Sequence, residues 1–132
     1  MQTLAIRDEL ASDLGQADYV ITINLTARRL TARDLIRERV RQEVEDFNNR
    51  QPELFHGLVQ PNDTERTLNG FKFPKKRKLH WEEQFEKAIE GFHRNAYILL
   101  VDDLQIQELD QVIPLSSETS VTFLKLVPLV GG

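Results

Sequence analysis

Apolar and polar residues alternate along the first clear strand of the chain. In Tyr19–Thr26, β-branched and aliphatic residues occupy every second position, which is typical of a strand with one buried face. A shorter apolar stretch, Thr3–Ile6, precedes it and is separated from it by the Asp-, Ser- and Gly-containing segment Ala11–Asp18. The two stretches predict a hairpin with a long connection.

A helical period follows the hairpin. Thr31 and Asp34 form the T-x-x-D pattern that caps helices at their start, and an asparagine pair followed by Pro52 predicts the end. One apolar stripe recurs at spacings of four, four and three residues: Ile36, Val40, Val44 and Phe47.

The face opposite this stripe is rich in arginine and glutamate. Arg39 and Glu43, like Arg41 and Glu45, are four residues apart, a spacing at which opposite charges pair on a helix surface. We therefore expect the arginines to form a solvated face rather than an anion-binding site.

The segment 50–80 has no clear period, and its Gly, Pro and Asn residues predict a loop-rich excursion. Scattered apolar residues would attach it to the domain: Phe55, Leu58, Val59 and Leu68. It closes with the basic run Lys75, Lys76, Arg77 and Lys78. Such a run is usually a solvated loop, with contact to an acidic partner or to nucleic acid as the alternatives.

A second amphipathic helix is predicted over Trp81–Asn95, and its apolar stripe is assigned to the core. The stripe comprises Trp81, Phe85, Ala88, Ile89 and Phe92. We expect this helix to pack on the first helix or on the sheet edge and to present the basic run outward.

Short strands fill the remainder of the chain. Tyr97–Val101 predicts a buried strand, Asp102 and Asp103 a turn, and Leu104–Gln107 a short partner strand. Val112–Leu115 then leads through a turn at Ser116–Thr119 into the final strand. On that strand Val121, Phe123 and Lys125 share one face and Thr122, Leu124 and Leu126 the other, so both faces are mixed. Whichever face points outward, here represented by Leu124 and Leu126, is the candidate partner patch.

Composition bounds the class of protein. A chain of 132 residues with 29% charged and 40% hydrophobic residues predicts one globular domain. It has no cysteine for disulfides or thiolate zinc sites, and no signal-peptide or bilayer-length apolar segment, so we expect a cytoplasmic protein. The net charge of −4 argues against general nucleic-acid affinity.

No pattern typical of an active site emerges. The adjacent Asp102 and Asp103 suit a turn better than an acid–base pair. The three histidines have no metal-ligand spacing, the serines lack a G-x-S-x-G context, and no Gly-rich phosphate loop occurs. These absences favour a substrate or binding partner over an enzyme.

The final residues suggest a reactive carboxyl end. An aliphatic run leads through Pro128, Leu129 and Val130 into Gly131 and Gly132. Glycine lacks Cβ, so the backbone there could enter a channel too narrow for other residues. Pro128 should end the strand and release the tail, leaving two apolar side chains for a partner's groove. The alternative is an ordinary frayed terminus.

Two stretches, Tyr97–Asp110 and Ser117–Gly132, resemble the strand, turn, short strand and terminal strand of ubiquitin. The resemblance implies an α+β, ubiquitin-like β-grasp fold, a mixed sheet with a crossing helix. It is close over 96–132, weaker over 1–49, and has no counterpart for 50–95. The domain would therefore span 1–132, with an insertion at 50–95 and a flexible tail at 128–132. Bacterial ubiquitin-like modifiers, encoded beside E1-, E2- and deubiquitinase-like genes, are the expected relatives.

The resemblance also implies a chemistry. An E1-like enzyme would adenylate the Gly132 carboxylate with ATP and Mg²⁺, which this chain would not itself bind. A modifier would then pass through a thioester, with an E2-like enzyme, to an amine on a target protein, and a deconjugating protease would reverse the step. The printed sequence ends at Gly132, so no protease would be needed to expose it.

Two alternatives remain open. The tail is also similar to the sulfur carriers of molybdopterin and thiamin synthesis, in which Gly132 would become a thiocarboxylate. A β-grasp adaptor that never reacts at its terminus is the other.

Overall fold

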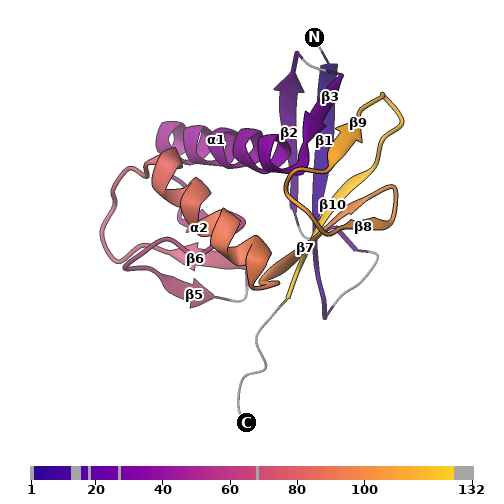
Figure 1. Cartoon of the computed structure of the whole chain (residues 1–132). Coiled ribbons are helices and arrows are strands. Elements are labelled where there is room, and N and C mark those ends of the chain that lie inside the picture. The colour runs from indigo at the N-terminus through magenta and orange to yellow at the C-terminus, as the bar shows by residue number, and fades with distance from the viewer. Residues whose placement is uncertain (1, 13–15, 18, 27, 68, 127–132) are drawn as a thin grey trace.

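The molecule is built on a mixed five-stranded sheet with the order β2-β1-β10-β7-β8 (Figure 1). The computed structural model describes residues 2–12, 16, 17, 19–26, 28–67 and 69–126. The strands of this sheet are β1 (Gln2–Leu10), β2 (Tyr19–Leu25), β7 (Tyr97–Val101), β8 (Leu104–Ile106) and β10 (Val121–Lys125).

The strands that come first and last in the sequence, β1 and β10, lie side by side in the middle of the sheet. β1 runs parallel to β10, with Ile6 opposite Val121, and pairs antiparallel with β2 on its other side. β10 also pairs antiparallel with β7, which pairs antiparallel with β8. The predicted hairpin is confirmed, although its first strand is longer than Thr3–Ile6 and continues to Leu10.

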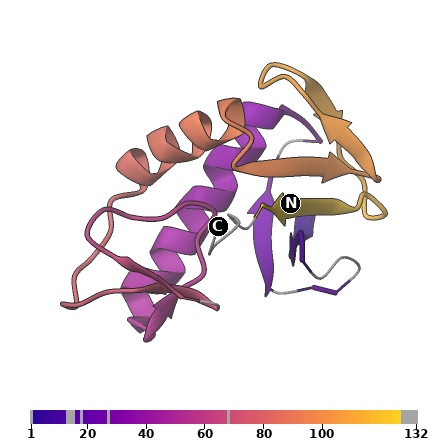
Figure 2. The ribbon, with the colours of Figure 1, turned by 90° about the horizontal axis from the view of Figure 1, so that it is seen from below.

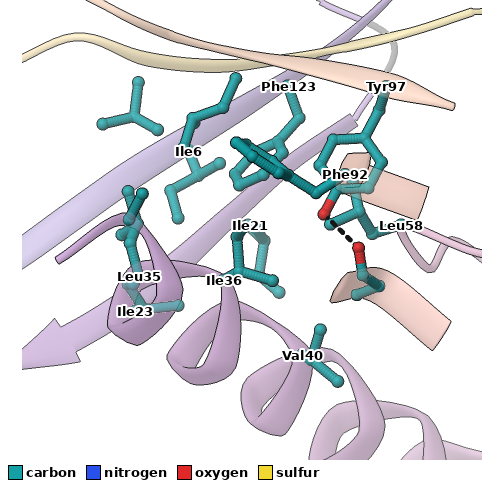
Figure 3. Close-up of a cluster of buried hydrophobic side chains, with 14 of the residues drawn as sticks. Ile6, Ile21, Ile23, Leu35, Ile36, Val40, Leu58, Phe92, Tyr97 and Phe123 are labelled. Carbon is teal, nitrogen blue, oxygen red and sulfur yellow. Dashed lines mark hydrogen bonds between the residues drawn. The ribbon is translucent and has the colours of Figure 1, made fainter. Parts of the chain in front are cut away.

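One helix, α1 (Ala32–Arg50), crosses the sheet. The Thr31 side chain accepts from the Asp34 N–H and Asp34 accepts from the Thr31 N–H, so the predicted capping pattern is present as a capping box. The helix ends in a left-handed residue, Gln51, at φ 47°. Its apolar stripe packs on the isoleucines and Phe123 of the sheet to form the core (Figure 3).

The segment after α1 is more regular than its sequence suggests. Three short strands, β4 (Leu54–Phe55), β5 (Glu65–Thr67) and β6 (Gly70–Lys72), form a small sheet in the order β4-β6-β5. Strands of two or three residues are too short to show a period, which is why the pattern predicted loops. Phe55 is buried and meets the rings of Phe47 and Phe73 edge-on, with centroids 5.2 and 6.5 Å from its own.

The second helix, α2 (Trp81–His93), packs on α1, as predicted for one of its two alternatives. Both helices lie on the same side of the main sheet (Figure 2). Ala88 and Phe92 are buried, and the remaining apolar residues of its stripe pack against the core. The buried hydroxyl of Tyr97, the first residue of β7, donates a 2.6 Å hydrogen bond to the carbonyl of Ala88 in α2, drawn as a dashed line in Figure 3.

Two further strands, β3 (Arg29–Thr31) and β9 (Val112–Pro114), pair antiparallel near the start of α1. The turn between β7 and β8 lies at Asp102 and Asp103, as predicted, with φ of 50° and 66°. The described residues thus form an α+β arrangement of two helices, a mixed sheet and two small sheets. No helix in the described part of the chain is long and apolar enough to cross a membrane.

Candidate functional site

The candidate site lies where β10 ends and the carboxyl-terminal residues begin. The predicted tail residues, from Pro128 to Gly132, lie outside the described part of the chain, which ends at Leu126. The site is therefore described from the strand that carries the tail and from the elements around its last residues.

The structure settles which face of β10 is buried. Val121 and Phe123 are almost inaccessible and belong to the core. Leu124, on the opposite face, is half-buried and stands opposite Ile98 of β7, while Thr122 stands opposite Leu100. The outer face of the sheet thus carries neighbouring apolar side chains. Ile98, Leu100 and Leu124 are called the outer patch below.

Beyond the outer patch, Leu126 is the last described residue. It is 37% exposed, and its backbone N–H donates to the Ala96 carbonyl over 3.3 Å. The sequence proposed Leu124 and Leu126 together as a partner patch. The structure places both at the end of β10, with Leu124 the more buried of the two.

An ionic cluster lies beneath the end of β10. The Arg39 guanidinium is fully buried, donates through both terminal nitrogens to the carboxylate of Asp8 on β1, and donates through Nε to Glu43 over 3.0 Å. The expectation of a solvated face is wrong for Arg39 and Glu43. They lie beside the apolar stripe of α1, and Asp8 makes burial of the guanidinium possible by supplying a buried counter-charge.

The cluster joins β10 to the segment 50–95, which the resemblance to ubiquitin would make an insertion and which keeps that name below. Lys125 Nζ lies 3.4 Å from Asp8 Oδ2 and donates to the Gly57 carbonyl over 3.0 Å. On the other side, Glu43 Oε1 accepts from the Leu58 backbone N–H over 3.2 Å. Asp8, Arg39, Glu43 and Lys125, called the ionic cluster below, therefore connect β1, α1, β10 and the segment 57–58. The insertion is fixed at the root of the tail.

The two acids of the ionic cluster respond differently to burial. Burial favours the neutral form of Asp8, but Arg39 and Lys125 outweigh it, and the pKa of that carboxyl lies below its ordinary value of 3.8. Burial dominates at Glu43, whose pKa is raised even though Arg39 and the Leu58 N–H partly offset the effect. For Arg39 burial opposes the charge, but the two carboxylates raise its pKa above the ordinary value.

Two grooves flank Leu126. One has a volume of about 410 Å³ and lies within the insertion, between the segment 58–71 and α2, and its lining includes Val59, Lys87 and Arg94. The other, of about 120 Å³, lies between the insertion and the end of β1. Arg66 and Phe71 line both, and the Arg66 guanidinium lies over the Phe71 ring, 5.5 Å from its centroid. A partner that contacts the tail would therefore also meet the insertion.

The basic run lies apart from this site, between β6 and α2. Lys75, Lys76, Arg77 and Lys78 are all exposed, as expected. Arg77 alone is attached to neighbouring groups: its guanidinium lies 4.9 Å from the centre of the Phe73 ring and donates to the Asn62 carbonyl.

The sequence predicted the pair of Arg39 with Glu43, which is confirmed, but not the burial of this pair or its contact with Asp8 and Lys125. A signal for the burial existed. On α1, positions 39 and 43 fall between the stripe residues 36, 40, 44 and 47, so they share the buried face. Asp8, an acid inside a strand, offered the matching charge. Comparison with protein-family models, curated proteins and solved structures found no match for this chain.

Proposed function

We propose that this chain is a ubiquitin-like β-grasp protein modifier that is activated at the carboxylate of Gly132. An E1-like enzyme would adenylate that carboxylate with ATP and Mg²⁺. Transfer through a thioester, with an E2-like enzyme, would then join it to an amine on a target protein, and a deconjugating protease would release it. The chain is the substrate in these steps and supplies no catalytic group.

One observation carries the proposal: the strand that leads into Gly131 and Gly132 lies at the centre of the sheet. β10 pairs on both sides, with β1 and β7, and α1 crosses the sheet behind it. A mixed sheet with a crossing helix is the arrangement expected of a β-grasp fold. In such a fold the sheet would hold the root of the tail firmly.

Recognition of the tail would be apolar. The residues from Val127 to Gly132 carry no charged side chain, so an activating enzyme would contact Pro128, Leu129 and Val130 through apolar surface. The outer patch and Leu126 would provide the surface next to this contact. The exposed basic run would suit an acidic segment of a partner.

The direct test is a denaturing immunoblot of N-terminally tagged protein in its native host. Wild type is compared with a variant that lacks Gly131 and Gly132, and with the exposed-loop variant Ser117→Asp as a control for tagging and expression. Bands of higher mass in wild type and in Ser117→Asp, absent from the deletion, are expected. Identical bands in all three samples would refute conjugation through the tail.

The apolar contact has its own test, the substitution Leu129→Asp. A carboxylate in an apolar groove loses its hydration without a partner, so adenylation by the activating enzyme should fall by about tenfold or more. The measurement is ATP–pyrophosphate exchange with the purified activating enzyme. Ser117→Asp adds the same charge elsewhere and should exchange at the wild-type rate. Unchanged exchange with Leu129→Asp would contradict apolar recognition.

A sulfur carrier is the second candidate, because the tail Val127-Pro-Leu-Val-Gly-Gly132 is similar to that class. Its product is a thiocarboxylate at Gly132, which is heavier than the carboxylate by the difference between sulfur and oxygen. Intact mass of protein purified from the host decides between the two. If neither conjugates nor the heavier mass are found, a non-reactive adaptor remains.

A further inference from the structure

The strand β2 forms one edge of the main sheet and is long for an edge. It has seven residues, whereas β8 at the opposite edge has three. Its ladder runs to β1 alone, and among the described residues no other segment forms a backbone hydrogen bond with Tyr19–Leu25. The outer side of β2 therefore presents a row of backbone donors and acceptors.

Over its described residues, this edge lacks three of the features that usually prevent strand pairing: charge, proline and short length. Natural edge strands are protected by charged residues, proline, bulges or short length. The sequence of β2, Tyr-Val-Ile-Thr-Ile-Asn-Leu, contains no charge, no proline and no glycine. By contrast, the neighbouring β1 includes Arg7, Asp8 and Glu9. An unprotected edge of this length is a surface for pairing with another strand.

The sequence of β2 is suited to pair with itself. We propose that two copies of the chain associate through their β2 strands, antiparallel, with the two-fold axis at Thr22. Thr22 would then face Thr22, Ile21 would face Ile23, and Val20 would face Asn24. The members of each pair have the same burial class in the single chain, buried with buried and exposed with exposed. The two sheets would join with their cores on the same side.

The absence of charge allows β2 to pair with a second copy of itself. Like charges directly opposite one another destabilise strand pairs, and a strand without charges avoids this cost when it meets itself. The β-branched pairs that self-association would create, threonine with threonine and isoleucine with isoleucine, are favourable cross-strand neighbours. This association requires neither the tail nor its activation.

The test places a charged side chain at position 22, which lies on the two-fold axis of the proposed dimer. Thr22 is exposed, so Thr22→Lys and Thr22→Glu should fold as wild type does, which circular dichroism can check. In each variant alone, two like charges would face each other, and the dimer dissociation constant from sedimentation velocity should rise by about tenfold or more. In an equal mixture lysine faces glutamate, so a mixed dimer should form.

Gln105→Lys is the matched control, because it places the same charge on β8 at the opposite edge, where the side chain is also exposed. It should dimerise as wild type does. Three results would overturn the proposal. Wild type could stay monomeric, and the edge would then be left for a strand of a different protein. The Thr22 variants could dimerise as wild type does, or their mixture could stay monomeric although each variant is folded.

Discussion

At the scale of single residues, the buried charge of Arg39 has the largest consequences. A guanidinium without solvent requires carboxylates within reach, and Asp8 supplies one from a different element. Each charge is compensated only while both elements stay in place. The contact between β1 and α1 is therefore specific in position, which apolar packing alone would not ensure.

Asp8→Asn should destabilise the protein, because it leaves Arg39 buried with one carboxylate fewer. Removing one partner of a buried ion pair costs about 3–5 kcal/mol, which urea unfolding at neutral pH would measure. The matched control is Asp110→Asn, at an exposed acid whose nearest cation, Arg33, is 3.9 Å away. A loss no larger than that of the control would contradict the role given to Asp8.

The same substitution has a predictable dependence on pH. The folded pKa of Asp8 lies below 3.8, so its ionised form stabilises the protein above that pH, and this contribution is lost as the pH falls through the folded value. The difference in unfolding free energy between wild type and Asp8→Asn should therefore shrink below pH 3.8. Repeating the series with Glu43→Gln in both proteins removes the titration of the second carboxyl. A difference that stays constant would argue against the lowered pKa.

At the scale of elements, the insertion is held by packing around Phe55. A Cβ built on Gly57 would lie 2.0 Å from an atom of the Phe55 ring, and that ring is buried. Glycine is therefore required here by the close approach of the ring. The Gly57 carbonyl also receives the hydrogen bond from Lys125, so this position connects the insertion to the root of the tail.

Gly57→Ala should destabilise the protein by about 1–3 kcal/mol, because the added methyl group must displace a packed aromatic ring. Gly91→Ala is a suitable comparison. Its added carbon would lie 3.2 Å or more from its neighbours, and alanine is the better helix former, so a change within about 1 kcal/mol is expected. Thermal unfolding of both variants measures this. Equal stability of the two would show that the Phe55 ring moves aside freely.

Elements with a period of their own could be predicted from the sequence. Tyr97–Val101 and both helices have the bounds that their patterns indicated, to within two residues. The pairing of β3 with β9 and of β4 with β6 could not be predicted. These strands have only two or three residues each, and they form because segments distant in the sequence meet. The helical spacing predicted the pairing of Arg39 with Glu43. Its second partner, Asp8, could not be assigned, because the burial of Arg39 depends on β1, which no helical pattern describes.

At the scale of the whole molecule, the insertion and the sheet form one connected body. α2 packs on α1, and the ionic cluster joins the insertion to β10. The rings of Phe47 and Phe73 stack, and the Phe55 ring meets both edge-on. The basic run is the exposed connection within this body. A cut there should leave both parts associated, because the contacts that hold them do not depend on it.

Limited trypsin digestion should therefore cleave first after Lys75, Lys76 or Lys78. Arg77 is held by Phe73 and Asn62 and should be cut more slowly. The two fragments should elute together in size-exclusion chromatography and separate in denaturing gels. Replacing the three lysines with alanine should slow the first cut. Early cleavage within 81–93, or separation of the fragments under native conditions, would show that α2 is not firmly packed.

The parallel pairing of β1 with β10 also determines when the protein can fold. The central ladder joins residues from nearly opposite ends of the chain, so it cannot form until the ribosome has synthesised β10. Contacts so distant in sequence are expected to make folding slow. A truncated chain would lack the strand that fills the centre of the sheet, and it would expose the apolar core to chaperones and proteases. Only chains that reach β10 would therefore present an ordered root for the tail.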